Sequence, residues 1–162
     1  MKNHFPRKLM TIIAFIIIFN LNVFAKPSVI PQNTAKVEQM LKQAGLTYKR
    51  VSDTVWVVKT KGSVLPEFDM LIAENSGVLV VGVVMLNKKN LKLSPDLLFK
   101  LLKFNHEKDY VKVGVDNDDD LFVRAELNLK KLEPEEFKIV FNTVVMLADD
   151  VYTEIKPFIV TQ

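Results

Sequence analysis

The chain has 162 residues, with 22 Lys and Arg, 19 Asp and Glu, two His and no Cys. This length fits one domain that buries its own core. The absence of Cys excludes disulfides, thiol catalysis, Fe–S clusters and a lipid-modified cysteine. With so few His and no Cys, we expect no transition-metal site and no cofactor.

The first 25 residues have the pattern of an export signal. A positive start and a short apolar core are followed by a Val23-Phe24-Ala25 cleavage pattern. The apolar core, residues 9–21, is shorter than the ~20 residues of a membrane span. We therefore predict that residues 1–25 are a signal peptide, that the mature chain begins near Lys26, and that it is periplasmic or secreted in a bacterium. An uncleaved anchor is the alternative.

The excess of positive charge lies in that predicted signal. The signal holds three of the 22 basic residues and none of the 19 acidic ones, which leaves 19 of each sign in the predicted mature chain. A neutral, mixed surface gives no reason to expect binding to nucleic acid or to an anionic membrane. We also expect no stable membrane insertion once the signal is removed.

An extended lead-in over residues 26–32 and a single domain over residues 33–162 are predicted to follow. Asn33 or Thr34 can cap a first helix, and Gly45 stands where a left-handed terminator belongs. The helical spacing of apolar residues between them indicates one buried stripe.

The hydrophobic period then changes from helical to alternating, which indicates strands. Trp56 lies within the second strand and is expected to anchor the core. Asn75-Ser76-Gly77 is a hairpin turn, since Asn and Gly tolerate positive φ. The strand after it is apolar on both faces, which suggests a central strand covered on both sides, and Gly82 within it suggests a bulge or the close approach of another group. The four strands are expected at residues 46–51, 54–59, 68–74 and 78–86.

The second half of the domain begins with a helix, then two strands, then a long helix. Ser94-Pro95-Asp96 is a helix start, with Ser as the cap and Pro at the first helical position. Strands over Tyr110–Asp116 and Leu121–Leu129 surround an acidic turn, and a helix over residues 134–156 ends the domain. The apolar stripe of the first of these helices comprises Leu97, Leu98, Leu101, Leu102 and Phe104.

The predicted fold class is α+β, an antiparallel sheet with helices packed on one face in the order α-β-β-β-β-α-β-β-α. Runs of neighbouring strands, with helices between the runs, are typical of this class and not of alternating βαβ units.

No residue pattern assigns a catalytic, cofactor-binding or metal-binding residue. His106, predicted just past a helix end, is typical of a surface residue that interacts with the helix dipole. The run Asp116–Asp120 begins like a calcium loop, but Leu121 and Leu127 stand where the Gly and the bidentate Glu are needed. We interpret the run as a hairpin turn and leave weak calcium binding open. Glu67 and Asp69 share a strand face at ~7 Å, a spacing that glycoside chemistry can use, although a solvated face is the simpler interpretation.

Phe104-Asn105, followed by the paired strands around the Asp116–Asp120 turn, resembles the YbjN family of bacterial sensory transduction regulators. The likeness extends over most of residues 33–156, although members often have a Gly in the acidic turn and this chain has only Asp and Asn there. The resemblance implies a fold similar to type III secretion chaperones and a non-enzymatic protein that binds another protein, possibly as a dimer. Those chaperones act in the cytoplasm, so the predicted signal argues against that particular role.

The resulting hypothesis is an exported binding or regulatory module that recognises a polypeptide partner, or a second copy of itself, through an apolar sheet face. A carboxylate-dependent hydrolase of the cell envelope and a purely structural envelope protein are the alternatives. If the helices cover one face, the hairpin places two aromatic residues on the other, and the strand at residues 78–86 adds either its even-numbered or its odd-numbered residues. The predicted partner-binding residues are Tyr110, Phe122, Val81, Val83 and Met85.

Overall fold

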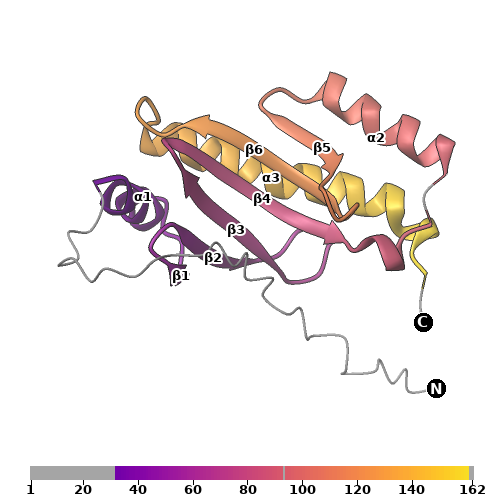
Figure 1. Cartoon of the computed structure of the whole chain (residues 1–162), viewed down its shortest axis with the longest axis horizontal. Helices are drawn as coiled ribbons and strands as arrows, with labels where there is room; N and C mark the ends of the chain where they lie inside the picture. Colours follow the sequence, from indigo (N-terminus) through magenta and orange to yellow (C-terminus); the bar gives the residue numbers. More distant parts are fainter. Residues whose placement is uncertain (1–31, 93, 161–162) are drawn as a thin grey trace, which may run out of the picture.

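The computed structural model describes residues 32–92 and 94–160, so the predicted signal peptide and nearly all of the lead-in lie outside the described residues. Within this part of the chain, an antiparallel sheet of six strands in the order β1-β2-β3-β4-β6-β5 is packed against three α-helices (Figure 1). The predicted α+β class and element order are confirmed. The elements are α1 (Gln32–Gln43), β1 (Tyr48–Ser52), β2 (Val55–Thr60), β3 (Phe68–Asn75), β4 (Val78–Leu86), η1 (Lys88–Asn90), α2 (Pro95–Glu107), β5 (Val111–Val115), β6 (Leu121–Asn128), α3 (Pro134–Ile155) and η2 (Lys156–Phe158).

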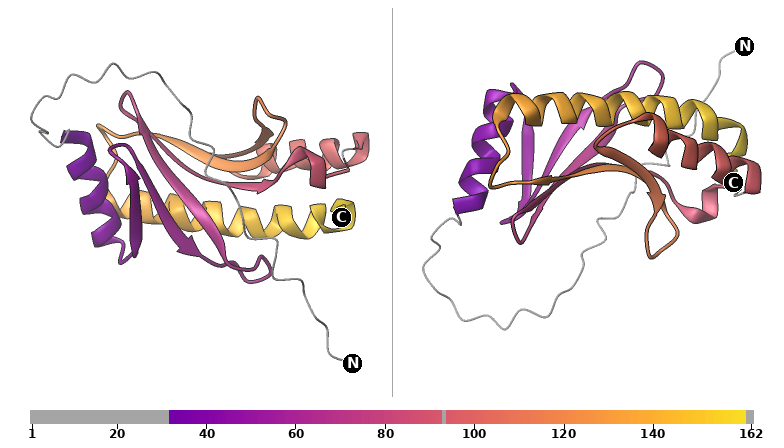
Figure 2. Two further views of the ribbon diagram at one scale, coloured as in Figure 1. Left: turned by 60° about the horizontal axis from the view of Figure 1, so that its bottom comes forward. Right: turned by 90° about the horizontal axis from the view of Figure 1, so that it is seen from above.

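The three α-helices lie on the same side of the sheet (Figure 2). The long helix α3 crosses the sheet and contacts β4, β5 and β6, while α2 lies against β5 and α1 contacts one end of α3. Burying apolar side chains between these layers is the main stabilising term of such a fold. The sheet residues buried beneath the helices are Trp56, Val58, Met70, Ile72, Leu79, Val81, Val83, Val111, Val113, Leu121, Val123, Ala125 and Leu127.

The predicted turns and caps fix the ends of these elements. Ser76 and Gly77 have φ values of 52° and 86°, so both central residues of the β3–β4 turn are left-handed, as the hairpin prediction requires. Gly45 ends α1 with φ 70°. The Ser94 hydroxyl accepts the Leu97 N–H at 3.2 Å and caps α2.

The first helix differs from its prediction at its start. It already includes Gln32, and Thr34 is a buried residue inside it whose hydroxyl donates to the Asp53 carbonyl at 2.8 Å. Thr34 therefore does not cap α1 but fastens it to the β1–β2 turn. The reason is that a Thr hydroxyl satisfies any carbonyl within its reach, and the neighbouring hairpin offers one.

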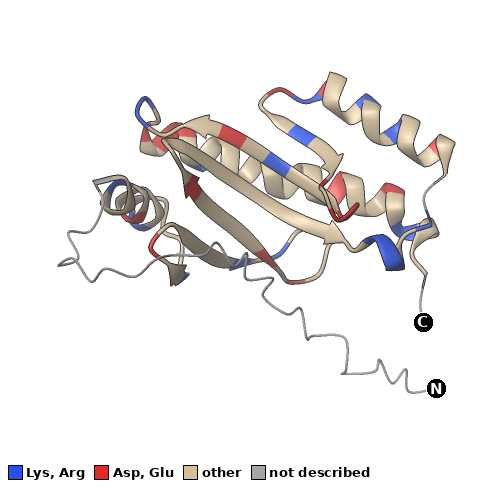
Figure 3. Ribbon diagram, in the orientation of Figure 1, with Lys and Arg blue, Asp and Glu red and all other residues tan. Residues whose placement is uncertain are grey.

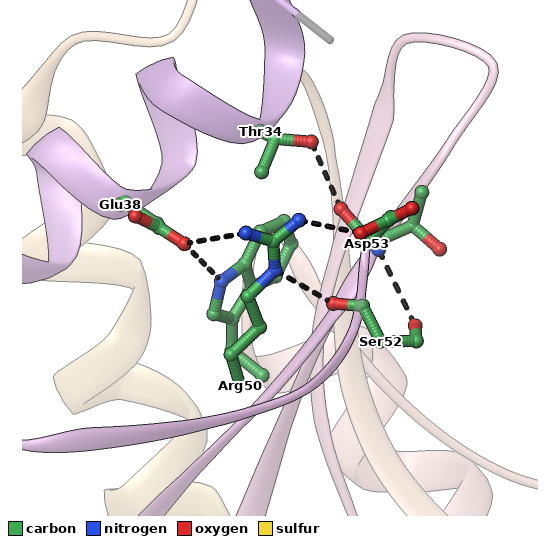
Figure 4. A network of polar contacts seen from close by, with 7 residues as sticks. Thr34, Glu38, Arg50, Ser52 and Asp53 are labelled. Atoms are coloured by element: carbon green, nitrogen blue, oxygen red, sulfur yellow. Dashed lines mark hydrogen bonds and ion pairs between the residues drawn. The ribbon is translucent and has the colours of Figure 1, made fainter. Parts of the chain in front are cut away.

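A polar network completes this junction of α1 with the β1–β2 hairpin (Figure 4). Glu38 on α1 accepts from the Trp56 indole at 3.3 Å and pairs with Arg50 at 3.6 Å. Arg50 in turn bonds the Asp53 carboxylate at 2.7 Å and the Ser52 carbonyl at 3.0 Å. Trp56 is fully buried, which confirms its expected role as a core anchor, and the network is structural in purpose.

The second helix buries a narrower stripe than its sequence predicts. Leu97 and Leu101 are buried and Phe104 is partly buried, but Leu98 and Leu102 are exposed. A short helix that packs on one edge strand covers only one narrow line of side chains. His106 lies in the last turn of α2 and not beyond its end.

Candidate binding surface on the open sheet face

The side of the sheet opposite the helices carries no described element, and we call it the open face; Figure 1 looks onto it, with α3 behind the sheet. Side chains on a strand alternate between faces, so β2, β3, β4, β5 and β6 each present their other residues here. Along β4 the odd-numbered residues from Leu79 to Val83 are buried, while Val78 and Val84 are 41% and 54% exposed; Val80 is partly exposed and Gly82 is buried. The open face comprises Val55, Val57, Leu71, Ala73, Val78, Val80, Gly82, Val84, Lys112, Gly114, Phe122, Arg124 and Glu126, with Lys59 and Asp69 at one end.

The structure separates the five predicted partner-binding residues. Val81 and Val83 are 0% and 5% exposed beneath the helices, so they cannot be part of an accessible surface. Met85 is partly buried against the core, close to the irregularity between Val84 and Leu86. The choice of the odd-numbered set on β4 was wrong, because both faces of that strand are apolar and the sequence holds no sign of which one the helices cover.

The two aromatic residues of the prediction are accessible in different ways. Phe122 lies half-buried on the open face. Tyr110 is 77% exposed but precedes β5 with φ 65°, so strand alternation does not determine which face it joins. Of the predicted set, Phe122 therefore has a definite place on the open face.

One row of residues across the sheet shows how the open face is divided. Val57 pairs with Leu71, Leu71 with Gly82, Gly82 with Arg124, and Arg124 with Lys112. The row is apolar over β2, β3 and β4, and it is charged over β6 and β5 and at its other end, where Lys49 of β1 pairs with Val57. Figure 3 shows the same division, with β4 free of charged residues and charges of both signs on β6.

The charged part is a compact cluster in which Arg124 is held from two sides. Its guanidinium lies 4.2 Å from the Phe122 ring centre, which is cation–π geometry. Its Nη2 atom is 3.0 Å from Glu126 Oε1, and Lys112 Nζ is 2.8 Å from the same oxygen. The hydrogen bond from Lys112 is the main reason why the pKa of the Glu126 carboxyl is lowered, with partial burial opposing it and Arg124 adding to it.

Two strand glycines make room for this cluster. A Cβ at Gly82 would lie 2.5 Å from Arg124 Cβ and 2.9 Å from the Val123 carbonyl oxygen, and one at Gly114 would lie 2.9 Å from the Phe122 ring. The close approach expected at Gly82 is therefore made by Arg124. No role was assigned to Arg124 or Glu126 from the sequence, and the two glycines opposite this cluster were the available signal of a close contact.

The other carboxylates form no catalytic arrangement. Glu67 and Asp69 both pair with Lys59 Nζ, at 3.5 and 3.3 Å, and all three side chains are more than half exposed. Hydrogen bonds and charge from Asp69, followed by Glu67, raise the pKa of Lys59. Carboxylates shared with one solvated ammonium lack the enclosed cleft that general acid catalysis needs.

The acidic run has its predicted turn conformation. Asp116 accepts the N–H groups of Asp118 and Asp120, at 2.9 and 3.0 Å, and Asp120 accepts the Lys88 N–H at 2.8 Å. Two of these carboxylates thus cap backbone groups, which is the ordinary use of Asp in turns. Across residues 32–92 and 94–160, no three His, Asp or Glu side chains gather as a metal-binding group, and no helix is long and apolar enough to cross a membrane.

These observations define an α+β protein with one bare sheet face and without an assembled catalytic group in the described part of the chain. Comparison with solved structures gives the same fold. YbjN from E. coli matches at TM-score 0.55 and 15% identity, covering 82% of this chain and 98% of that one. The ExoU–SpcU heterodimeric complex from the type III secretion system of Pseudomonas aeruginosa contains a match at TM-score 0.51 and 17% identity, covering 75% and 98%. The Yersinia pestis type III secretion chaperone SycH, in complex with a YscM2 fragment, matches at TM-score 0.46 and 14% identity, covering 75% and 98%.

A family model identifies the chain more closely. The model of YbjN, described as "putative bacterial sensory transduction regulator", matches residues 33–157, and the chain belongs to that family. No curated protein matches the chain. Family and fold together support a non-enzymatic regulatory or binding module.

Proposed function

We propose that this protein is an exported, non-enzymatic binding or regulatory module that recognises a polypeptide partner through its open face. One observation carries the proposal. Val57 and Leu71 are paired across β2 and β3, Val80 and Val84 flank Gly82, which is the partner of Leu71 on β4, and no described element covers these side chains. Continuous apolar surface of this kind is a common mark of an interaction site.

The comparisons favour a protein as the partner. The chaperone-like neighbour of Pseudomonas aeruginosa was crystallised in a heterodimeric complex within a secretion system. An extended or amphipathic segment suits a flat sheet face, since apolar side chains fill the shallow rows between strands.

Export is the second part of the proposal and depends on the sequence of residues 1–25. Their positive start, short apolar core and Val23-Phe24-Ala25 site are the features of a cleaved signal. N-terminal sequencing of the protein recovered from the periplasm or the medium should give a start at or near Lys26. Recovery of a chain with Met1 intact in the membrane fraction would reject export by cleavage.

A second copy of the chain is the alternative occupant of the open face. An isologous contact would bury the apolar rows of two copies against each other. The hydrolase alternative has no geometric support among the described residues, because the Glu67, Asp69 and His106 side chains are exposed.

Site-specific photo-crosslinking in the producing cells tests the proposal. A photoreactive residue replaces Val84 on the open face or, as a matched control, Met146 on the outer side of α3; the two side chains are 54% and 63% exposed. We expect a discrete adduct with another polypeptide at position 84 and none at position 146. An adduct of twice the chain's own mass would instead identify a homodimer. Equal labelling at both positions, or none at either, would reject the open face as the binding surface.

A further inference from the structure

We infer that the open face selects a partner segment whose apolar side chains are accompanied by an acidic side chain, which binds Arg124 and Lys112. This inference rests on the proposed function and adds the chemistry of the partner. It is carried by the position of the charged cluster, which lies on the same face as the apolar rows, on β6 and the edge strand β5.

The Arg124 guanidinium is held in place before any partner arrives. Phe122 packs against it at 4.2 Å and Glu126 bonds it at 3.0 Å, so little side-chain freedom remains to be lost on binding. Its Nε atom is buried without a hydrogen-bond partner among the described residues, which is a cost that an exposed, mobile Arg would avoid. A side chain at position 82 would collide with Arg124 itself, and one at position 114 would displace the Phe122 ring that packs against it. Four features of the sheet thus keep one cation at a fixed position.

The charges of the cluster favour an added carboxylate. Lys112 and Arg124 contribute two positive charges, and both are bonded to a single oxygen of one carboxylate, Glu126. The Lys112 and Arg124 side chains remain 46% and 36% exposed, so an incoming group can reach them. A guanidinium presents several donors in a planar fork that suits carboxylate oxygens.

The neighbouring apolar rows determine what else the segment carries. Leu71 and Arg124 belong to the same row and are separated by two strand spacings, ~10 Å. Between them lies Gly82, whose missing side chain leaves the space that Arg124 occupies. An extended segment that crosses the strands would place an apolar side chain over Leu71 and Val80 and a carboxylate near Arg124 two residues further on, because only residues at even spacing face the same side. Apolar contacts around an ion pair exclude water and strengthen it.

Fluorescence anisotropy with labelled peptides tests the inference. The protein is used in the form that is recovered from its producing cells. The probes are ten-residue peptides with one apolar frame and a blocked C-terminus, which differ only in a Glu, Gln or Lys two residues after a Leu, so that both side chains face the sheet when the peptide is extended. We expect the Glu peptide to bind about tenfold more tightly than the Gln peptide, as a charge-assisted hydrogen bond would give. The Lys peptide should bind most weakly.

The variants separate recognition from structural support. Arg124→Gln should abolish the Glu preference while retaining binding of the Gln peptide, and Arg124→Glu should favour the Lys peptide. Lys138→Gln, which removes a cation from the exposed side of α3, should change nothing. If the Arg124 variants weaken all three peptides equally, Arg124 only supports the sheet and the inference is overturned.

Three further outcomes of the peptide experiment would overturn the inference. Equal binding of the three peptides to the unaltered protein would overturn the acidic preference and leave the proposed function standing. Tighter binding of a Gln peptide with a free C-terminus than of the blocked Glu peptide would show recognition of a chain end and overturn the inference. If none of the peptides binds while the crosslink at position 84 still forms, the inference fails separately from the proposed function.

Discussion

The two faces of the sheet are built from the same strands and differ in what covers them. The face beneath the helices is apolar and buried over its central part, and every strand from β2 to β6 contributes to it. The open face is apolar over the centre of β2, β3 and β4, with Lys59 and Asp69 at one end; it is charged over β5 and β6, and no described element covers it. The fold can form without the open face being apolar, so its Val and Leu side chains need another explanation. We take that explanation to be a partner.

The two faces of the sheet can be compared within one strand, β4, where we expect the largest difference in stability between two variants. Val81→Asp would bury an unpaired carboxylate beneath α3, and we expect a loss of about 4 kcal/mol in the free energy of unfolding. Val84→Asp, three residues on, places the same group in water and should cost less than about 1 kcal/mol. Denaturant melts of the two variants measure the difference. Equal losses would mean that both faces of β4 are buried.

The apolar and charged parts of the open face meet where Gly82 of β4 contacts Arg124 of β6, and substitutions at these two positions test that contact. Gly82→Ala puts a methyl group 2.5 Å from Arg124 Cβ, and the forced shift should cost about 2 kcal/mol. Arg124→Gly alone should cost less, and combining it with Gly82→Ala should relieve part of the clash. A double-mutant cycle from thermal melts gives the coupling. Strict additivity would show that Arg124 does not occupy the space that Gly82 leaves.

The contact between Asp149 on α3 and the β2–β3 loop should make the stability of the fold depend on pH. The open face has no such contact among the described residues. The Asp149 carboxylate on α3 accepts three backbone N–H groups of the β2–β3 loop, from Ser63 at 2.5 Å, Val64 at 3.2 Å and Leu65 at 2.7 Å. Partial burial raises the pKa of Asp149, but these three bonds outweigh it and the net pKa is lowered from 3.8. Asp149→Asn should cost about 1–2 kcal/mol at neutral pH.

The sign of the pH dependence follows from that lowered pKa. The stabilising contribution is fully present above the unfolded pKa and is lost as the pH falls through the folded pKa. The stability gap between the unaltered protein and Asp149→Asn should therefore be constant near neutral pH and close below about pH 3.9. A gap that persists unchanged at pH 2 would contradict the assignment. Gly62→Ala should give a similar loss, because its Cβ would collide with this carboxylate.

The smallest effect is expected at the free edge of β5. The Asn105 carboxamide donates to the Val113 carbonyl at 3.0 Å and accepts its N–H at 2.7 Å, as a neighbouring strand would. Asn105→Ala should cost about 1 kcal/mol and leave this edge open to pairing with another chain. Analytical ultracentrifugation should show more self-association in the variant than in Asn142→Ala, a control on the exposed side of α3. Identical sedimentation of the two variants would show that Asn105 does not protect the edge of β5 from pairing.

The sequence predicted the elements well because their signals are local. The turn at Asn75-Ser76-Gly77, the Ser94 cap and the terminator Gly45 each act within a few residues, and all three are confirmed. The alternation on β5 and β6 also placed Phe122, Arg124 and Glu126 on the face opposite the core. The Phe104-Asn105 pair belongs to the family resemblance, and its Asn closes the edge of β5.

The site was harder to predict because it depends on contacts between distant segments. The packing of α3, some 50 residues later in the chain, decides which face of β4 is covered. A strand that is apolar on both faces gives no sequence signal for either choice. The Arg124 cluster joins β5 and β6 and lies opposite glycines of two strands, so its geometry appears only with the register. Thr34 is a further example: its sequence position suits a helix cap, but in the structure its buried hydroxyl bonds the Asp53 carbonyl.

Oxidative footprinting of the protein in an extract of its producing cells tests the central claim most directly. The reactivity of three open-face side chains, Leu71, Val84 and Phe122, is compared with that of Ile139 and Met146 on the outer side of α3, in the extract and after purification. We predict that the open-face residues are protected in the extract by a factor of several and that the two α3 residues react equally in both samples. Equal reactivity of Leu71, Val84 and Phe122 in the two samples, or protection confined to α3, would contradict the assignment of the open face as the binding surface.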